Sequence, residues 1–195
     1  EGSQTLIRVA QELGVQRFVF ASTCSNYGRM DDAEAYVVET SALNPLSIYA
    51  ETKVEFERTL LGMPRTSVTK PTCLRFSTVY GMSPRIRFDL TVNEFTRELV
   101  LGKELLIFGE QFWRPYCHVT DLARSAIAVI EADETAVAYE VFNVGATEEN
   151  YQKKMIVDAI VEQVPAAQVK YVPKDDDPRD YRVNFDKITK QLGFQ

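Results

Sequence analysis

The sequence predicts an α/β fold built on a parallel sheet. Segments with the apolar spacing of helices, over residues 3–13 and 47–62, alternate with segments typical of strands, over residues 15–21 and 74–79. The first of these strands is almost wholly apolar, as expected for a parallel strand that helices cover on both faces. Regular alternation of helix and strand is the pattern of α/β folds. We therefore expect two helices and two parallel strands in this part of the chain.

A second, smaller α/β lobe is expected after the second strand. The apolar spacing predicts helices over 88–101, 152–164 and 186–192, and strands over 104–108, 141–145 and 169–172. A further helix is expected to begin at Thr120 or Asp121, either of which can cap a helix N-terminus. We divide the chain into residues 1–81 and residues 82–195, with segments near 118–145 returning to the first domain.

Composition narrows the class of protein. With 195 residues, 45% of them hydrophobic, the chain is expected to be globular, and its net charge of −6 disfavours nonspecific nucleic-acid binding. No apolar run approaches the about 18 residues of a membrane span. Cys24, Cys73 and Cys117 are widely spaced and His118 is the only histidine, so we expect reduced thiols, a cytoplasmic protein and no metal site.

Three residues predict a proton-transfer site. Thr23 follows the first strand, and Tyr49 and Lys53 lie four residues apart in the second helix. Residues at this spacing share a helix face, and an ammonium beside a phenol stabilises the phenolate. Such a tyrosine can serve as general acid and base. Taken alone, the pair also fits an amphipathic helix with an exposed lysine.

The order of segments adds a resemblance to this local pattern. The strand ends in Ser22-Thr23, a Tyr-Gly turn and an Asn-Pro loop follow, and the helix with Tyr49 comes next. This order resembles the extended short-chain dehydrogenases/reductases, in their nucleotide-sugar epimerase/dehydratase branch. The resemblance implies a Rossmann-like doubly wound sheet, NAD as cofactor with NADP not excluded, a nucleoside-diphosphate sugar as substrate, and a homodimer.

The same resemblance implies roles for individual residues. The catalytic residues would be Thr23, Tyr49 and Lys53. The cofactor-binding residues would be Ser22, Tyr49, Lys53, Phe76 and Val79. The substrate-binding residues would be Thr23, Ser25, Thr78, Asn93, Arg114 and Arg179. Most of these also have a purely structural interpretation, such as a strand-terminal hydroxyl, a core side chain or a solvated surface arginine.

Two segments carry the substrate assignments. Residues 75–81 resemble the family's Arg-x-x-Asn-x-Tyr-Gly segment, with Thr78 where Asn is common. Residues 113–121 resemble an Arg-Asp-Tyr/Phe-x-His-Val-x-Asp run whose arginine, here Arg114, clamps the substrate diphosphate through its fixed fork of donors. His118 is interpreted as a structural residue where the following helix begins.

The leading functional hypothesis is epimerisation of the sugar, most simply at C4. The family's 4,6-dehydratases have Asp and Glu where this chain has Cys24 and Ser25, and neither residue replaces a carboxyl pair, so dehydration is not expected. A base role for Cys24 in 3,5-epimerisation is a weaker alternative. A ketosugar reductase or dehydrogenase and a truncated, non-catalytic sugar-nucleotide module also remain open.

The chain contains no Gly-x-x-Gly-x-x-Gly segment before its first helix, whereas family members carry one in their first βαβ units, where the dinucleotide pyrophosphate binds. We therefore expect these units to be absent and the first strand to have an unpaired apolar edge. Alone, the 195 residues should bind NAD weakly. Isothermal titration calorimetry tests this prediction, and nanomolar or low-micromolar affinity would contradict it.

Overall fold

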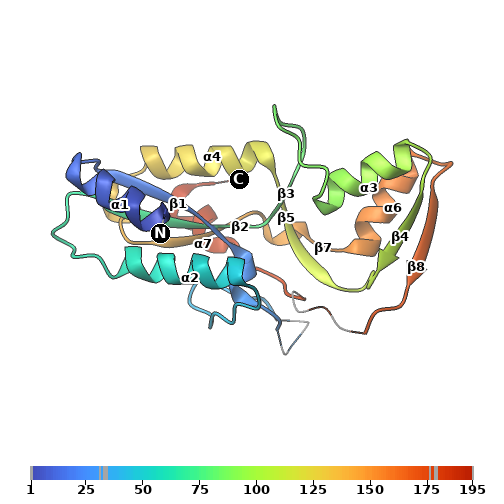
Figure 1. Cartoon of the computed structure of the whole chain (residues 1–195), viewed down its shortest axis with the longest axis horizontal. Helices are drawn as coiled ribbons and strands as arrows, with labels where there is room; N and C mark the ends of the chain where they lie inside the picture. The colour runs from blue at the N-terminus through green and yellow to red at the C-terminus, as the bar shows by residue number, and fades with distance from the viewer. Residues whose placement is uncertain (1, 31, 33–34, 176, 178–179, 195) are drawn as a thin grey trace.

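The protein has two lobes arranged end to end (Figure 1). The computed structural model describes residues 2–30, 32, 35–175, 177 and 180–194. One lobe is a three-stranded sheet with helices on both faces, and the other is a two-stranded sheet with two helices. In the described part of the chain, no helix is both long enough and apolar enough to cross a membrane. The predicted α/β class with a parallel sheet is confirmed.

The first sheet determines where a ligand can bind. It contains β1 (Arg17–Thr23), β2 (Lys70–Phe76) and β6 (Val141–Val144), all parallel and in the order β1-β2-β6. Thr23 is paired with Phe76, so the carboxyl ends of β1 and β2 lie at the same edge. Open α/β sheets bind ligands outside this edge. Among the described residues, β1 pairs with no strand other than β2.

Helices cover both faces of this sheet. On one face lie α1 (Gly2–Glu12) and α2 (Ile48–Leu61), and on the other lie α4 (Val119–Glu131), the short α5 (Glu134–Val137) and α7 (Asp186–Leu192). Figure 1 shows α4 above the strands and α2 below them.

The two faces have separate apolar cores because successive strand residues point in opposite directions. Cys73 packs toward α2, with Phe56 and Leu60. Its neighbour Leu74 packs on the opposite side, with Phe142. A strand that is buried on both faces must be apolar at successive positions, which explains the pattern of these strands.

The second lobe has its own small core. Strands β4 (Glu104–Phe108) and β8 (Gln168–Val172) form a parallel pair, and α3 (Thr91–Val100) and α6 (Lys153–Gln163) pack on it. The buried side chains of this core are Leu99, Leu105, Ile107 and Val157. Because one face of the pair is covered by helices, β4 alternates between buried and exposed residues.

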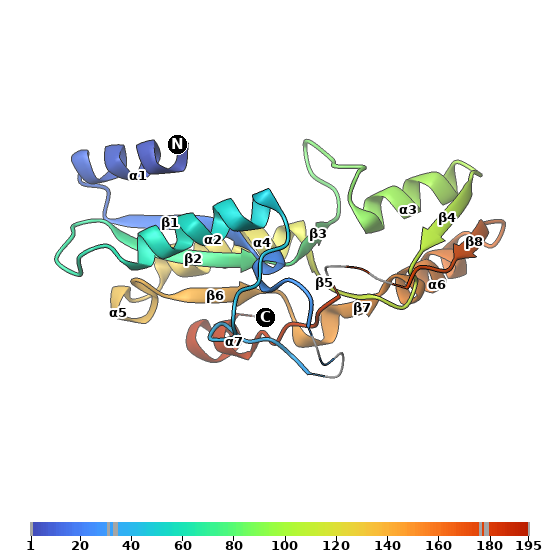
Figure 2. The same cartoon turned by 60° about the horizontal axis from the view of Figure 1, so that its bottom comes forward.

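Three short strands lie between the two lobes (Figure 2). Strand β3 (Thr78–Tyr80) runs parallel to β5 (Trp113–His118), and β7 (Asn150–Gln152) runs antiparallel to β5. A single-turn helix, η2 (Thr147–Glu149), precedes β7. These strands carry the chain from the end of the first sheet into the second lobe.

The predicted strand over 74–79 is wrong in its bounds. It is two strands, β2 and β3, separated at Ser77, whose hydroxyl donates to the carbonyl oxygen of Val144 at 2.7 Å. Strand β2 also begins earlier, at Lys70. The break occurs because β3 leaves the first sheet and pairs with β5.

The predicted cap of α4 is also wrong. The helix begins at Val119, and the cap is His118, whose Nδ1 accepts a hydrogen bond from the Thr120 backbone N–H at 3.3 Å. This contact agrees with the structural role expected for His118. Asp121 lies in the first turn and forms an ion pair with Arg124.

Packing of α4 on the first sheet provides a stability test. Val129 is 1% exposed, whereas the adjacent Ile130 is 54% exposed. We expect Val129→Ala to lower the free energy of unfolding by about 2 kcal/mol, because it removes two buried methyl groups and leaves a cavity. Urea denaturation measures the effect. The matched control Ile130→Ala should change it by no more than about 0.5 kcal/mol, and equal losses for both variants would contradict this placement of α4.

Candidate active site

A cavity of about 320 Å³ opens at the carboxyl ends of β1 and β2. Eight residues predicted as site residues line it: Ser22, Thr23, Ser25, Tyr49, Lys53, Phe76, Thr78 and Val79. They come from β1, α2, β2, β3 and the turn after β1, so the fold gathers segments that are far apart in the sequence. A larger cavity of about 650 Å³ lies between α3 and α6, but it is mainly apolar in its lining and contains none of these eight residues.

The hydroxyl of Thr23 forms one local hydrogen bond and keeps its hydrogen for a ligand. It caps the single-turn helix η1 (Cys24–Tyr27), with Oγ1 accepting a hydrogen bond from the Ser25 N–H at 3.1 Å. A hydroxyl has one donor and two acceptor sites, so this bond leaves the hydrogen of Thr23 able to donate to an oxygen in the cavity. The cap fixes the side chain beside that space.

Lys53 and Tyr49 extend from the first turns of α2. The helix begins at Ser47, whose hydroxyl accepts from the Ala50 N–H at 3.2 Å. The Lys53 ammonium donates to the Ala21 carbonyl oxygen at 2.7 Å and lies 5.7 Å from the centre of the Tyr49 ring. Partial burial lowers the pKa of Lys53. Tyr49 is 57% exposed, so its phenol is accessible from the cavity.

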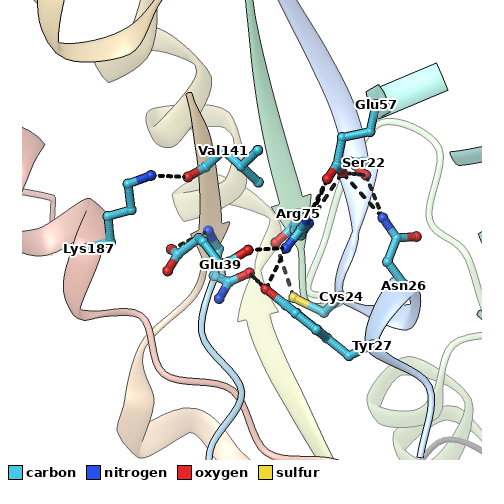
Figure 3. A network of polar contacts seen from close by, with 10 residues as sticks. Ser22, Cys24, Asn26, Tyr27, Glu39, Glu57, Arg75, Val141 and Lys187 are labelled. Carbon is cyan, nitrogen blue, oxygen red and sulfur yellow. Dashed lines mark hydrogen bonds and ion pairs between the residues drawn. The ribbon is translucent and has the colours of Figure 1, made fainter. Parts of the chain in front are cut away.

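Ser22 is held from behind the cavity. Its hydroxyl donates to a Glu57 carboxylate oxygen at 2.8 Å and accepts from the Asn26 side-chain amide at 3.1 Å (Figure 3). Both hydrogen bonds are buried. The predicted contact of Ser22 with a cofactor stays a prediction, and the hydroxyl is engaged elsewhere in this structure.

Cys24 is placed poorly for proton transfer. It is 1% exposed, and its thiol donates to the Arg75 carbonyl oxygen at 3.2 Å. Burial raises the pKa of Cys24 far above its ordinary value. A buried, protonated thiol cannot take a proton from a sugar carbon, which argues against the 3,5-epimerisation alternative.

Two predicted substrate residues lie away from the lining of this cavity. The side chain of Asn93 accepts from the Gly81 N–H at 3.0 Å and donates to the Arg87 carbonyl oxygen at 3.0 Å, which fixes the loop before α3. Arg114 is buried and forms a 2.8 Å ion pair with Asp177. Arg179 falls outside the described residues. The substrate roles of all three stay predictions.

Five lining residues were not predicted: Ala21, Ser77, Arg87, Leu90 and Tyr181. Arg87 forms an exposed ion pair with Asp89, with Nε 3.0 Å from Oδ1. Tyr181 comes from the segment after β8, so only the tertiary fold brings it to β1. Besides Lys53, the two arginines Arg85 and Arg87 are a sequence signal for positive charge in this part of the chain.

The chemistry of the cavity is defined by hydroxyl groups and cations. Among the described residues that line it, there is no Asp, Glu or His. The groups able to exchange a proton are the phenols, the alcohols and the Lys53 ammonium. This set suits reversible proton transfer at an alcohol and lacks a carboxyl acid–base pair.

Comparison with known proteins identifies the family of this chain. The family model described as "NAD dependent epimerase/dehydratase family" matches residues 1–145. A relative from Bacillus subtilis (strain 168), described as the uncharacterized UDP-glucose epimerase YtcB, is 35% identical over 147 residues, which are 74% of this chain and 44% of that protein. The UDP-glucuronate 4-epimerase of Thermodesulfobacterium geofontis (strain OPF15) is 26% identical over 190 residues, 97% of this chain and 56% of that protein.

A solved structure extends the similarity to the whole chain. DesIV, a dTDP-glucose 4,6-dehydratase from Streptomyces venezuelae with NAD and TYD bound, superposes with a TM-score of 0.84 at 26% identity, covering 100% of this chain and 59% of DesIV. The chain thus spans about half the length of the relatives it matches. The predicted family is confirmed: the chain belongs to the NAD dependent epimerase/dehydratase family, a family of enzymes that act with NAD.

Proposed function

We propose that this chain carries the catalytic and sugar-binding part of an NAD-dependent epimerase that inverts C4 of a nucleoside-diphosphate sugar. The observation that supports it is the convergence of Thr23, Tyr49 and Lys53 on one cavity at the carboxyl ends of the strands. A phenol, an alcohol and an ammonium in one cavity are the groups that reversible oxidation of a sugar hydroxyl requires.

Each residue has a separate task in this proposal. The Tyr49 phenolate takes the proton of the C4 hydroxyl, and Thr23 donates a hydrogen bond to the same oxygen. Lys53 provides a positive charge close to the phenol, which stabilises its anionic form. When the hydroxyl forms again on the other face of the sugar, Tyr49 returns the proton.

The lining residues fit the nicotinamide end of NAD. The Lys53 ammonium has three N–H donors, and one of them is used by Ala21, so others can hold ribose hydroxyls. Phe76 and Val79 provide an apolar wall. NAD, when bound, supplies the redox chemistry by accepting and returning hydride at the sugar carbon.

Epimerisation is favoured over dehydration by the lining of the cavity. Elimination of water requires an acid and a base beyond the tyrosine. Among the described residues, the cavity has no carboxyl group, and Cys24 is buried behind it. The similarity to DesIV therefore supports the fold, and the lining of this cavity does not support elimination by this chain.

Two classes of sugar are candidates. The relatives named above include a UDP-glucose epimerase and a UDP-glucuronate 4-epimerase. Arg87 lines the cavity and pairs with Asp89 at the surface. An exposed ion pair is worth no more than about 1 kcal/mol, so a sugar carboxylate can replace Asp89. We propose that Asn93, Arg114 and Arg179 serve the nucleotide diphosphate, as the family resemblance implies.

We also propose that the protein acts as a cytoplasmic homodimer. Ile48, at the start of the helix that carries Tyr49, is 80% exposed and apolar, which supports an interface on α2. All three cysteines are free thiols, as expected in a reducing compartment.

Replacing Tyr49 with Phe tests the proposed function. In the complete gene product with NAD, this change should lower turnover of UDP-glucose or UDP-glucuronate by roughly 100- to 10,000-fold, because it removes the proton-transfer group. Nuclear magnetic resonance of the sugar product measures conversion. Tyr171→Phe, on β8 and remote from the cavity, is the matched control and should retain turnover.

Unchanged turnover in the Tyr49→Phe variant would end the mechanistic assignment. The same assay separates the alternatives, because an epimerase shows no net change in absorbance at the wavelength of reduced NAD. Stoichiometric reduction or oxidation of the cofactor would indicate a reductase or dehydrogenase. No conversion by the parent protein, despite binding of the sugar nucleotide, would indicate a non-catalytic module.

A further inference from the structure

A buried ion pair lies directly behind the candidate active site, outside the cavity itself. Glu57 of α2 and Arg75 of β2 form it, and their side chains are only 2% and 4% exposed (Figure 3). Arg75 Nε also lies 3.1 Å from a carboxylate oxygen of Glu57. Neither residue lines the cavity, so neither is in a position to touch a substrate there.

The carboxylate of Glu57 joins three elements at the same place. Besides Arg75 on β2, it accepts from Ser22, the penultimate residue of β1, at 2.8 Å and from Asn26 of η1 at 3.3 Å. Ser22 immediately precedes Thr23. Asn26 belongs to the single-turn helix that Thr23 caps. The hydrogen bonds of one carboxylate therefore fix the strand end on which Thr23 sits.

The carboxylate of Glu57 is also connected to Tyr49 and Lys53, because all three residues belong to α2. Glu57 lies four residues after Lys53 and eight after Tyr49 in α2, so the three follow one face of the helix. A shift or rotation of α2 against the sheet would move Tyr49 and Lys53 together relative to Thr23. Apolar packing alone is non-directional, whereas hydrogen bonds fix a register because they depend on angle.

We infer that Glu57 and Arg75 are positioning residues that hold the helix with Tyr49 and Lys53 in register with the strand end that carries Thr23. The inference rests on the proposed function, because it assigns a role to groups behind the catalytic residues named there.

The electrostatics of Arg75 agree with a fixed, charged guanidinium. Burial by itself lowers the pKa of Arg75, but its hydrogen bonds with Glu57 and the nearby charges raise it above the ordinary value of arginine. The guanidinium also donates to the Tyr27 hydroxyl at 2.9 Å and to the Glu39 carbonyl oxygen at 3.0 Å (Figure 3). Its donors are thus distributed among several segments, which leaves little freedom to reorient.

Replacing both partners separates positioning from stability. A buried ion pair exchanged for apolar residues of similar size leaves no unpaired charge, so Glu57→Leu/Arg75→Met should remain folded, with a lower thermal midpoint because Ser22 and Asn26 lose a buried hydrogen-bond partner. In the complete gene product, we expect kcat for epimerisation to fall by about 100-fold, the typical effect of misplacing a catalytic group by 1 Å, with KM changed by less than about threefold. A folded double variant with the parent's kcat would overturn the inference.

If the double variant does not fold, a single substitution with a smaller effect on stability tests the positioning role. Asn26→Leu removes one buried donor to Glu57, and it should lower kcat while leaving KM unchanged. Thr72→Val is the matched control: it removes a buried hydroxyl that donates to the Val137 carbonyl oxygen at 2.7 Å on the same sheet, and it should affect stability but not kcat. Equal kcat for both variants would overturn the inference.

A crystal structure without ligand tests the positioning role of Glu57 and Arg75 independently of the proposed function. In a crystal structure of the double variant, the 2.7 Å bond from Lys53 to the Ala21 carbonyl oxygen should be lost, because α2 shifts against β1. Its retention would overturn the inference. If the parent protein does not epimerise sugars, the proposed function fails, and this distance still tests the positioning of α2.

Discussion

The ion pair between Glu57 and Arg75 is the constraint on which the candidate active site depends. Each charge costs several kcal/mol to remove from water, and the attraction between them recovers this only when the geometry is good and the remaining polar atoms are bonded. Here Ser22 and Asn26 donate hydrogen bonds to the carboxylate of Glu57. The guanidinium of Arg75 donates to the Tyr27 hydroxyl and to the Glu39 carbonyl oxygen. The arrangement is compatible with a single placement of α2 on the sheet. It therefore determines the cavity that lies in front of it.

The buried residues behind the cavity hold the site in place, and the residues that line the cavity are accessible to a ligand. Behind the cavity, side chains are buried and bonded to one another. In front, Tyr49 is more than half exposed and Lys53 has donors to spare. A base that must take and return a proton needs access to its substrate, whereas the residues that orient it gain strength from a low dielectric. Thr23 belongs to both parts, since its oxygen caps η1 and its hydrogen is left to donate to a ligand in the cavity. This division explains how an open site can still be preorganised.

Local patterns in the sequence were sufficient for elements whose burial follows their own periodicity. The strand over 104–108 and the helix over 186–192 match in full, and α2 agrees within one residue at each end. Strand β5 could not be predicted, because it contains Pro115 and polar residues and forms only through its pairing with β3 and β7. The spacing of Tyr49 and Lys53 predicted two residues that line the cavity. Arg87 and Tyr181, which also line it, come from distant segments of the chain, as does Arg75, the ion-pair partner of Glu57. No local pattern reports such tertiary contacts.

We propose that Thr23 and Tyr49 act on one sugar oxygen. A crystal structure of the complete gene product carrying Tyr49→Phe, with NAD and a UDP-sugar bound, tests it directly. In this structure, we expect the C4 hydroxyl oxygen to lie within about 3.2 Å of Thr23 Oγ1 and to face the edge of the ring at position 49. A sugar bound with C4 outside the cavity at the ends of β1 and β2, and with no hydroxyl near Thr23, would contradict it.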